Sequence, residues 1–270
     1  MAVINTNVSA SIASNALVKN ERSLSKAMAQ LSTGNRINNA GDDAAGLAIS
    51  VTMTSQIKGL EAAIRNSNDG ISIAQTADGA LAEVTNMVQR MRELAVQASN
   101  GSLSVTERGY LDTEFDALRS AITSIGDSTE FNNTKILDTG AANFEITGAD
   151  GTAITTVTTV SMGGIMTSLA SGGITTAGSA QTLIGKADTT LASLASQRAS
   201  LGAAMNTLAF VADNQANELA NTQASRSRVM DTDYASATTE LARTQIIQQA
   251  GTAMLAQANQ LPQSVLALLQ

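Results

Sequence analysis

Apolar side chains in the last third of the chain recur at alternating steps of three and four residues, and this spacing constrains the fold more than any other feature. Such a repeat aligns the apolar side chains in one stripe along a helix, where they pack against a second helix. At roughly 1.5 Å per residue, about four such repeats make a rod about 40 Å long. The stripe consists of Leu191, Leu194, Leu201, Met205, Leu208, Ala212 and Leu219, and Arg198 and Gln215 interrupt it.

Helical spacing recurs in several other segments. We expect a helix from Ser9 to Leu31 that ends near Gly34, because glycine readily adopts the left-handed conformation that closes helices. The turn residues Asn66 to Gly70 predict a break between two later helices, and the second of these is expected to stop near Asn100 and Gly101. The remaining stripes are Ile49, Met53, Ile57, Leu60 and Ile64; Leu81, Val84, Val88, Met91 and Leu94; Leu111, Phe115, Leu118, Ile122 and Ile125; and Leu241, Ile247, Met254, Ala258 and Leu261.

The segment 140–185 has a different composition. Half of its residues are Gly, Ser or Thr, and its only charges are Glu145 and Asp150. A GADG turn at 148–151 and a β-branched run at 154–160 predict a hairpin. The rest of the segment, with Gly163, Gly164, Gly172 and Gly173, is expected to be exposed loop.

The composition favours thin helical seams over a globular core. Hydrophobic residues make up 43% of the chain but aromatic residues only 2%, so burial must come from Ala, Leu, Ile, Val and Met. The expected fold is mainly α: a long antiparallel helical coiled coil or bundle rod formed by both chain ends, with a small β-hairpin region in the middle.

The residues that are absent exclude several classes of function. The chain has no His and no Cys, which removes the commonest general base, the commonest zinc ligands and all disulfides. We therefore expect no enzyme, no metal and no cofactor. A net charge of −7 argues against nucleic acid as a partner. The first twenty residues do not have the pattern of a signal peptide, and no run is long enough to span a membrane, so we expect no membrane partner.

The segment Leu31 to Ser50 is expected to join two helices. Gly34 would close the first, and Asp42 and Asp43 would cap the second. A metal or acid/base pair is the alternative, but adjacent residues on a helix do not face the same way. Later in the chain, Asp231 and Asp233 resemble the start of a calcium loop that lacks its other ligands, so a helix-start role is favoured.

Both terminal segments need a partner surface, because an isolated helix with few large apolar residues is unstable in water. The residues expected to pack between arms or between copies are Leu24, Met28, Leu31, Ile247, Met254 and Leu261. The last arm also carries an uncharged polar face: Gln245, Gln248, Gln249, Gln257, Asn259, Gln260 and Gln263. Two interpretations remain open, a solvated helix face and a wall that lines an enclosed aqueous space or another subunit.

Four long motifs resemble bacterial flagellin. They are LSTGNRINNAGDDAAGLAIS at 31–50, NSNDGISIAQTADGALAEV at 66–84, QRMRELAVQASNG at 89–101, and the tail with QIIQQAGTAMLAQANQLPQSVLALL. They occur in the family's order in both terminal regions, and the central segment is not diagnostic. Asn35 and Gly41 depart from the pattern, since many relatives have Leu and Lys there.

The resemblance implies a structural subunit that polymerises into the flagellar filament for swimming motility, is exported unfolded through the type III channel and is assembled at the filament tip. It implies a short, secreted form without large outer domains, whose arms order on joining the extracellular filament. The implied domains are 1–42, the N-terminal arm of an inner helical domain; 43–140, the N-terminal part of an outer rod; 141–185, a hairpin and loop at the tip; 186–228, the C-terminal rod helix; and 229–270, the C-terminal inner arm.

The resemblance also implies partners and sites. Besides other copies of the chain, the partners would be an export chaperone on the C-terminal arm, the filament cap, the hook-filament junction proteins and the host Toll-like receptor for flagellin. Arg90, Leu94 and Glu114 lie at positions that match the family's receptor site. The alternative is that Leu94 belongs to a helix seam, and that Arg90 and Glu114 are surface charges that serve subunit packing. Ser and Thr within 147–182 are candidates for O-linked glycans.

Two other classes are weighed against this interpretation. A hook-filament junction protein has flagellin-like ends, but its versions of DDAAGLAIS and QRMRELAVQ are usually weaker. A secreted coiled-coil effector or adhesin would share the apolar repeats and the lack of Cys, and would not be expected to polymerise.

Overall fold

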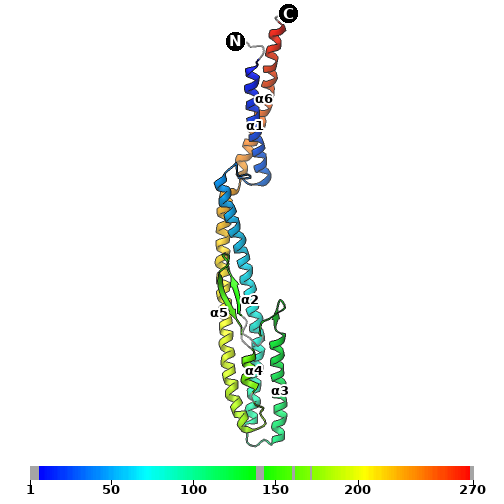
Figure 1. Ribbon diagram of the computed structural model, residues 1–270, viewed down its shortest axis with the longest axis vertical. Helices are drawn as coiled ribbons and strands as arrows, with labels where there is room; N and C mark the ends of the chain where they lie inside the picture. Colours follow the sequence, from blue (N-terminus) through cyan, green and yellow to red (C-terminus); the bar gives the residue numbers. More distant parts are fainter. Residues whose placement is uncertain (1–5, 138–142, 160–161, 171, 268–270) are drawn as a thin grey trace. The chain divides into compact units, whose positions relative to one another are not determined.

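The computed structural model describes residues 6–137, 143–159, 162–170 and 172–267, without the side chains of 166, 170 and 261–267. The helices are α1 (Val8–Thr33), α2 (Ala44–Ala98), α3 (Val105–Ser128), α4 (Met162–Ala170), α5 (Ala177–Met230) and α6 (Tyr234–Ala267) (Figure 1). The strands are β1 (Glu130–Phe131), β2 (Thr134–Lys135), β3 (Asn143–Thr147) and β4 (Ala153–Thr158). The mainly helical fold with a small β region in the middle is as predicted.

The chain divides into two compact units. The first unit comprises residues 1–55 and 221–270, and the second comprises residues 56–220. The domain boundaries expected from the family resemblance stay predictions.

The second unit has a continuous apolar core, and the predicted stripes form it. In α2 the whole stripe from Leu81 to Leu94 is buried, and in α5 Leu194, Leu201 and Leu208 are buried at intervals of seven residues. Phe115 and Ile122 of α3 lie in the same core. Arg198, which interrupts the α5 stripe, forms an ion pair with Asp78 of α2 at 2.6 Å. The helical periodicity therefore located this core correctly.

The predicted hairpin is present as β3 and β4. The strands are antiparallel, with Phe144 opposite Val157 and a bulge between Ile146 and Thr147. The Gly148 amide donates to the Thr152 carbonyl at 2.7 Å across the turn. Gly151 has a φ of +79°, a conformation that glycine adopts at little cost. Position 160, the end of the predicted β-branched run, lies outside the described residues.

The predicted break at Asn66–Gly70 is wrong, because these residues lie inside α2. Close packing explains the glycine: a Cβ at Gly70 would come within 2.8 Å of the Ile146 Cγ1 and 3.0 Å of the Leu208 Cδ1. Asn66 uses its amide to donate to the Thr147 carbonyl at 3.3 Å. The residues that signal a turn are here the ones that let the hairpin approach the helix.

The predicted exposed loop around Gly163 and Gly164 is also wrong, because α4 occupies 162–170. Met162, Ile165 and Leu169 bury one face of this helix in the core of the second unit. Their spacing of three and four is the helical signal. It was outweighed by the glycine content of the segment.

Two local sequence signals in the second unit set where α3 begins and how β1 turns into β2. Ser104 and Glu107 form a capping box at the start of α3, in which each side chain bonds to the other residue's backbone amide. Asn132 and Asn133 both have positive φ, 49° and 64°, in the two-residue turn between β1 and β2. These angles define the turn type whose twist matches that of paired strands.

Candidate functional site

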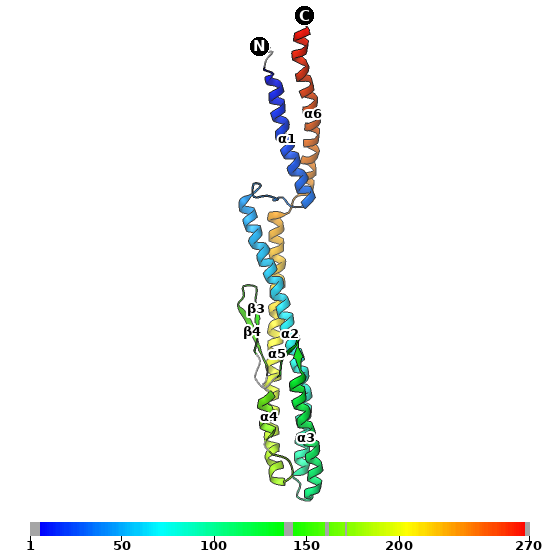
Figure 2. The same cartoon turned by 45° about the vertical axis from the view of Figure 1, so that its right-hand side comes forward.

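The terminal helices α1 and α6 of the first unit pack side by side and antiparallel (Figures 1 and 2). The Asn7 side-chain amide donates to the Ala258 carbonyl at 2.8 Å, and the Asn20 amide donates to the Thr244 carbonyl at 2.7 Å. Between these bonds, Leu17 lies against Gly251. The two ends of the sequence therefore form one helical pair.

The seam of this pair follows the alternation of three and four residues on both helices. Alanine and leucine occupy most of its positions, and two polar residues in it, Asn20 and Thr244, are buried. The buried or half-buried positions that follow this alternation are Ala10, Ala13, Leu17, Asn20, Leu24, Ala27 and Leu31 on α1, and Ala237, Leu241, Thr244, Gln248, Gly251, Leu255 and Ala258 on α6. Of these positions, Asn20, Ala27, Ala237 and Thr244 are buried and the others half-buried, so the pair covers its leucines only in part.

The first unit has little apolar core of its own. Among its described residues, the buried apolar side chains are Ala27, Ile37 and Ala237. Its exposed large apolar side chains are Val8, Ile12, Val18, Met28, Ile49, Val51, Tyr234, Ile246, Ile247 and Met254. An exposed apolar surface of this kind is typical of an interaction site.

Five of the six predicted packing residues have described side chains, and these fall into two groups. Leu24 and Leu31 are half-buried in the seam. Met28, Ile247 and Met254 are 55%, 42% and 65% exposed, so the seam does not use them. The Leu261 side chain lies outside the described residues.

The uncharged face of the last arm is exposed at most of its described positions. Gln248 is half-buried in the seam, and the Gln263 side chain is outside the description. The exposed members are Gln245, Gln249, Gln257, Asn259 and Gln260. After Arg243 the sequence carries no further charged side chain. The face is thus open to water or to a neighbour, and both interpretations remain available.

Hydrogen bonds join the end of α1 to the junction of α5 and α6. Gly34 ends α1 with a φ of +73°, and its amide donates to the Gln30 carbonyl. The Gly34 carbonyl accepts from the Thr232 amide at 3.0 Å. Arg36 donates from its backbone amide to the Met230 carbonyl at 2.6 Å and from Nη2 to the Val229 carbonyl at 2.7 Å. Arg36 therefore satisfies carbonyls at the end of α5.

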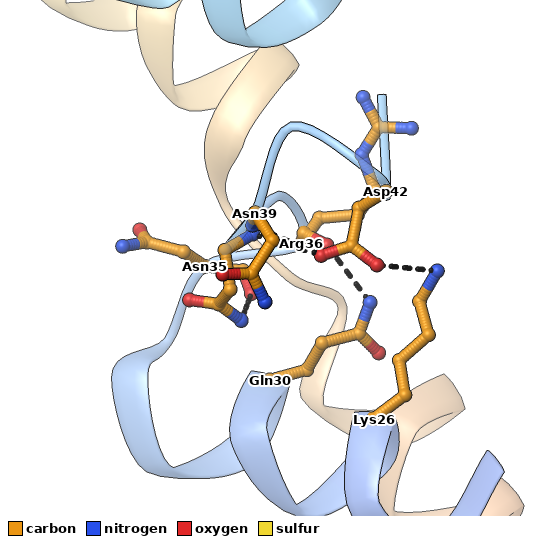
Figure 3. Close-up of polar contacts among 7 residues, drawn as sticks. Lys26, Gln30, Asn35, Arg36, Asn39 and Asp42 are labelled. Carbon is orange, nitrogen blue, oxygen red and sulfur yellow. Dashed lines mark hydrogen bonds and ion pairs between the residues drawn. The ribbon is translucent and has the colours of Figure 1, made fainter. Parts of the chain in front are cut away.

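The two aspartates of the joint act in different places. Asp43 precedes α2, and its Oδ1 accepts from the Gly46 amide at 2.9 Å. Asp42 instead pairs with the Lys26 ammonium at 2.9 Å and accepts from the Asn38 and Asn39 amides (Figure 3). The bond from Lys26, followed by the two amide bonds, lowers the pKa of Asp42 from its ordinary value. Asp42 thus ties the turn after α1 to α1 itself.

The three predicted receptor residues lie near one another in the second unit. The Arg90 Nε donates to the Glu114 Oε1 at 2.9 Å, and its Nη1 donates to the Glu93 Oε2 at 3.0 Å. These carboxylates, Glu114 first, raise the pKa of Arg90 from its usual value. Leu94 is 1% exposed and belongs to the core. A partner at this place would meet the three charged groups, including Glu93, and not the leucine.

The remaining predictions on polar sites concern glycans, metals and membranes. Within 147–182, Thr159 is buried and donates to the Ile136 carbonyl, which leaves no room for a glycan, while positions 161 and 171 lie outside the described residues. Asp233 accepts from the Ala235 amide at the start of α6, in the helix-start role expected of it. Across the described part of the chain, no cluster of acidic residues could hold a metal ion. No described helix is long and apolar enough to cross a membrane.

Comparison with known proteins gives matches over most of the chain. Residues 4–142 match the bacterial flagellin N-terminal helical region, and residues 184–269 match the bacterial flagellin C-terminal helical region. The flagellin of Halalkalibacterium halodurans is 45% identical over 271 residues, covering 99% of this chain and 100% of that protein. Flagellin A of Vibrio anguillarum is 35% identical over 375 residues, with 99% of each chain covered.

The solved structures include a related fold. The crystal structure of Bacillus cereus flagellin aligns with a TM-score of 0.51 and 30% identity, and covers 56% of this chain and 88% of that chain. The alignment with the Vibrio protein spans 375 positions, whereas this chain has 270 residues, so that relative carries additional segments. The present chain is a short form.

Proposed function

The chain belongs to the bacterial flagellin family, and on that premise we propose that its copies join through the apolar side chains that α1 and α6 expose. It is a structural subunit of the flagellar filament and not an enzyme. The family membership also decides against a secreted effector or adhesin with similar repeats. What is proposed is which surface holds the filament together.

The observation that carries this proposal is the imbalance within the first unit. It buries three apolar side chains among its described residues but leaves large ones exposed on both terminal helices. Fully burying one Val, Ile or Met is worth roughly 1.5–3 kcal/mol. Contacts with neighbouring copies would supply the burial that the half-buried seam lacks. The terminal arms would therefore be fully ordered only in the polymer.

A non-closing contact between copies gives an open helical polymer and not a ring. The uncharged face of α6 supports a further proposal, that this face lines an aqueous channel within the polymer. Its exposed glutamines and asparagine offer hydrogen bonds without a fixed charge. A channel wall of this type would hold a passing unfolded chain only weakly, because it presents no charge to bind.

Several finer roles belong to the same proposal. The chain would be exported unfolded, act outside the cell, and meet an export chaperone on the exposed part of α6. The filament cap and the hook-filament junction proteins would contact it at the filament ends. The host Toll-like receptor would contact Arg90, Glu93 and Glu114, which are exposed and ion-paired, whereas Leu94 would support them from the core.

Seeded growth of filaments tests the proposed surface. Val8→Thr with Val18→Thr removes apolar character from α1 at nearly constant shape, and Val105→Thr makes the same change on α3, where Val105 is also exposed. We expect the pair in α1 to raise the critical concentration for growth about tenfold or more, and Val105→Thr to change it little.

Two results would count against the proposal in different ways. If the wild-type monomer stays monomeric with fresh filament fragments as seeds, the proposal that the chain assembles into a filament is wrong. If the wild type grows and the α1 pair grows equally well, assembly takes place but uses another surface. Circular dichroism of each monomer verifies that the variants keep the helical content of the wild type.

A further inference from the structure

The contact between Leu17 of α1 and Gly251 of α6 leaves no room for a side chain at position 251 while Leu17 keeps its place. A Cβ placed on residue 251 would overlap the Leu17 Cδ1 and lie 3.8 Å from its Cγ. Leu17 thus fills the space that the missing side chain leaves. Gly251 is also the sole glycine in the sequence of α6.

We propose that Leu17 and Gly251 form a register pin that sets the one alignment in which the terminal helices pair. Five of the other seam positions are alanine, which discriminates poorly between alignments that differ by one heptad. A shift by seven residues would place Leu17 against Thr244 or Ala258, and both carry a Cβ. The pin therefore distinguishes the observed register from its nearest alternatives.

A second contact lies next to the pin and fixes the same spacing. The Asn20 side chain is buried and donates to the Thr244 carbonyl at 2.7 Å, one heptad along α6 from Gly251. A buried amide requires an acceptor at hydrogen-bond distance, so this bond keeps the helices close where the leucine enters. A single polar residue in an apolar seam is known to specify register in helical pairs.

The register matters because the exposed apolar side chains lie on two helices. A slip by one heptad would move Ile247 and Met254 of α6 by about 10 Å along α1 relative to its exposed side chains, such as Val18 and Met28. A neighbouring copy that fits the observed surface would then meet a different one. This inference rests on the proposed function, since it assumes that both helices form the surface that joins copies.

The test compares Gly251→Ala, Leu17→Val and the double variant in seeded growth. Alanine normally favours a helix over glycine, so any loss in Gly251→Ala must come from the added methyl group. Valine lacks the Cδ1 that the methyl group would meet. Gly79→Ala is the matched control, because Gly79 is helical and no atom lies within 4 Å of a Cβ there.

We expect Gly251→Ala to raise the critical concentration at least about tenfold. Leu17→Val in the same chain should bring it back to within roughly threefold of Leu17→Val alone. Gly79→Ala should assemble like the wild type. If Gly251→Ala assembles normally, or if Leu17→Val does not rescue it, the pin does not exist.

Cross-linking distinguishes a change in the alignment of α1 and α6 from a loss of stability of the helical pair. The chain has no cysteine, so Asn7→Cys with Ala258→Cys reports the observed alignment without background. In filaments grown above the critical concentration, the intramolecular cross-link should form in the wild-type background, fall severalfold with Gly251→Ala and return with the double variant. An unchanged yield in Gly251→Ala would overturn the register assignment. Failure of the wild type to grow would instead refute the proposed function.

Discussion

Arg108 should be one of the most sensitive positions in the second unit. The residue is 9% exposed, and its guanidinium donates from Nε to the Ala98 carbonyl at 2.8 Å and from Nη2 to the Asn100 carbonyl at 2.8 Å. Ala98 is the last residue of α2, so the arginine satisfies the end of that helix with a positive charge. Arg108→Met keeps the apolar stem and removes both bonds.

The two lost hydrogen bonds do not contribute equally to the loss in free energy of unfolding. The Asn100 carbonyl also accepts from the Leu103 amide at 3.3 Å, so it keeps a partner, and Ala98 is the carbonyl that suffers most. A hydrogen bond to a charged group contributes roughly 1.5–3 kcal/mol. We expect Arg108→Met to lower the free energy of unfolding by about 3 kcal/mol. For a unit of this size, that corresponds to a fall in Tm of about 6–12 °C.

Thermal unfolding followed by circular dichroism at 222 nm, with urea titration as a second measure, provides the assay. Arg119→Met is the matched control, because Arg119 forms only a surface pair with Asp116 on its own helix, and such pairs contribute at most about 1 kcal/mol. If Arg108→Met unfolds at the same temperature as Arg119→Met, the guanidinium does not stabilise the end of α2, and the argument fails.

Three further predictions concern single positions. Gly70→Ala should destabilise the second unit by about 1–2 kcal/mol because its Cβ meets Ile146 and Leu208, whereas Gly79→Ala should stabilise it by about 0.5–1 kcal/mol; urea unfolding that shows the same sign for both would contradict this. The Lys26 ion pair lowers the pKa of Asp42, so the Tm difference between wild type and Asp42→Asn should hold above pH 3.8 and shrink as the pH falls through the lowered pKa; a difference that grows on acidification would refute it. Asn133→Gly should keep the β1–β2 turn and Asn133→Val should lose about 1 kcal/mol or more, since residue 133 has a φ of +64°; equal unfolding midpoints would exclude this reasoning.

The sequence predicted those parts of the fold in which burial follows a helical period. Leu81, Val84 and Val88 are buried because they recur on one side of α2, and the chain alone carries that information. Gly70 misled the prediction because glycine serves both turns and close approaches, and only the contact with Ile146 tells them apart. The α4 helix was missed since three well-spaced apolar residues had to be recognised in a segment rich in glycine.

The candidate site was predicted less completely than the core. The sequence pointed to the terminal arms, but it did not separate the seam residues Leu24 and Leu31 from the exposed Met28. That separation depends on how α1 meets α6, and these helices come from opposite ends of the chain. The Leu17 and Gly251 contact is of the same kind. Neither residue is unusual in its own helix, and the fit exists only between them.

The two units solve different physical problems with similar helices. The second unit buries leucine, valine and isoleucine among helices and a hairpin of the same chain, so this core is built within one copy. In the first unit, the leucines between α1 and α6 are only half-buried, and large residues such as Met28 and Met254 stay exposed. A seam that buried its leucines fully would stabilise the pair in the monomer, and it would then contribute little to the free energy of joining a filament. On the proposed function, an exposed apolar surface would make ordering of the arms depend on assembly, because the free energy released by covering that surface would be available only at a neighbouring copy.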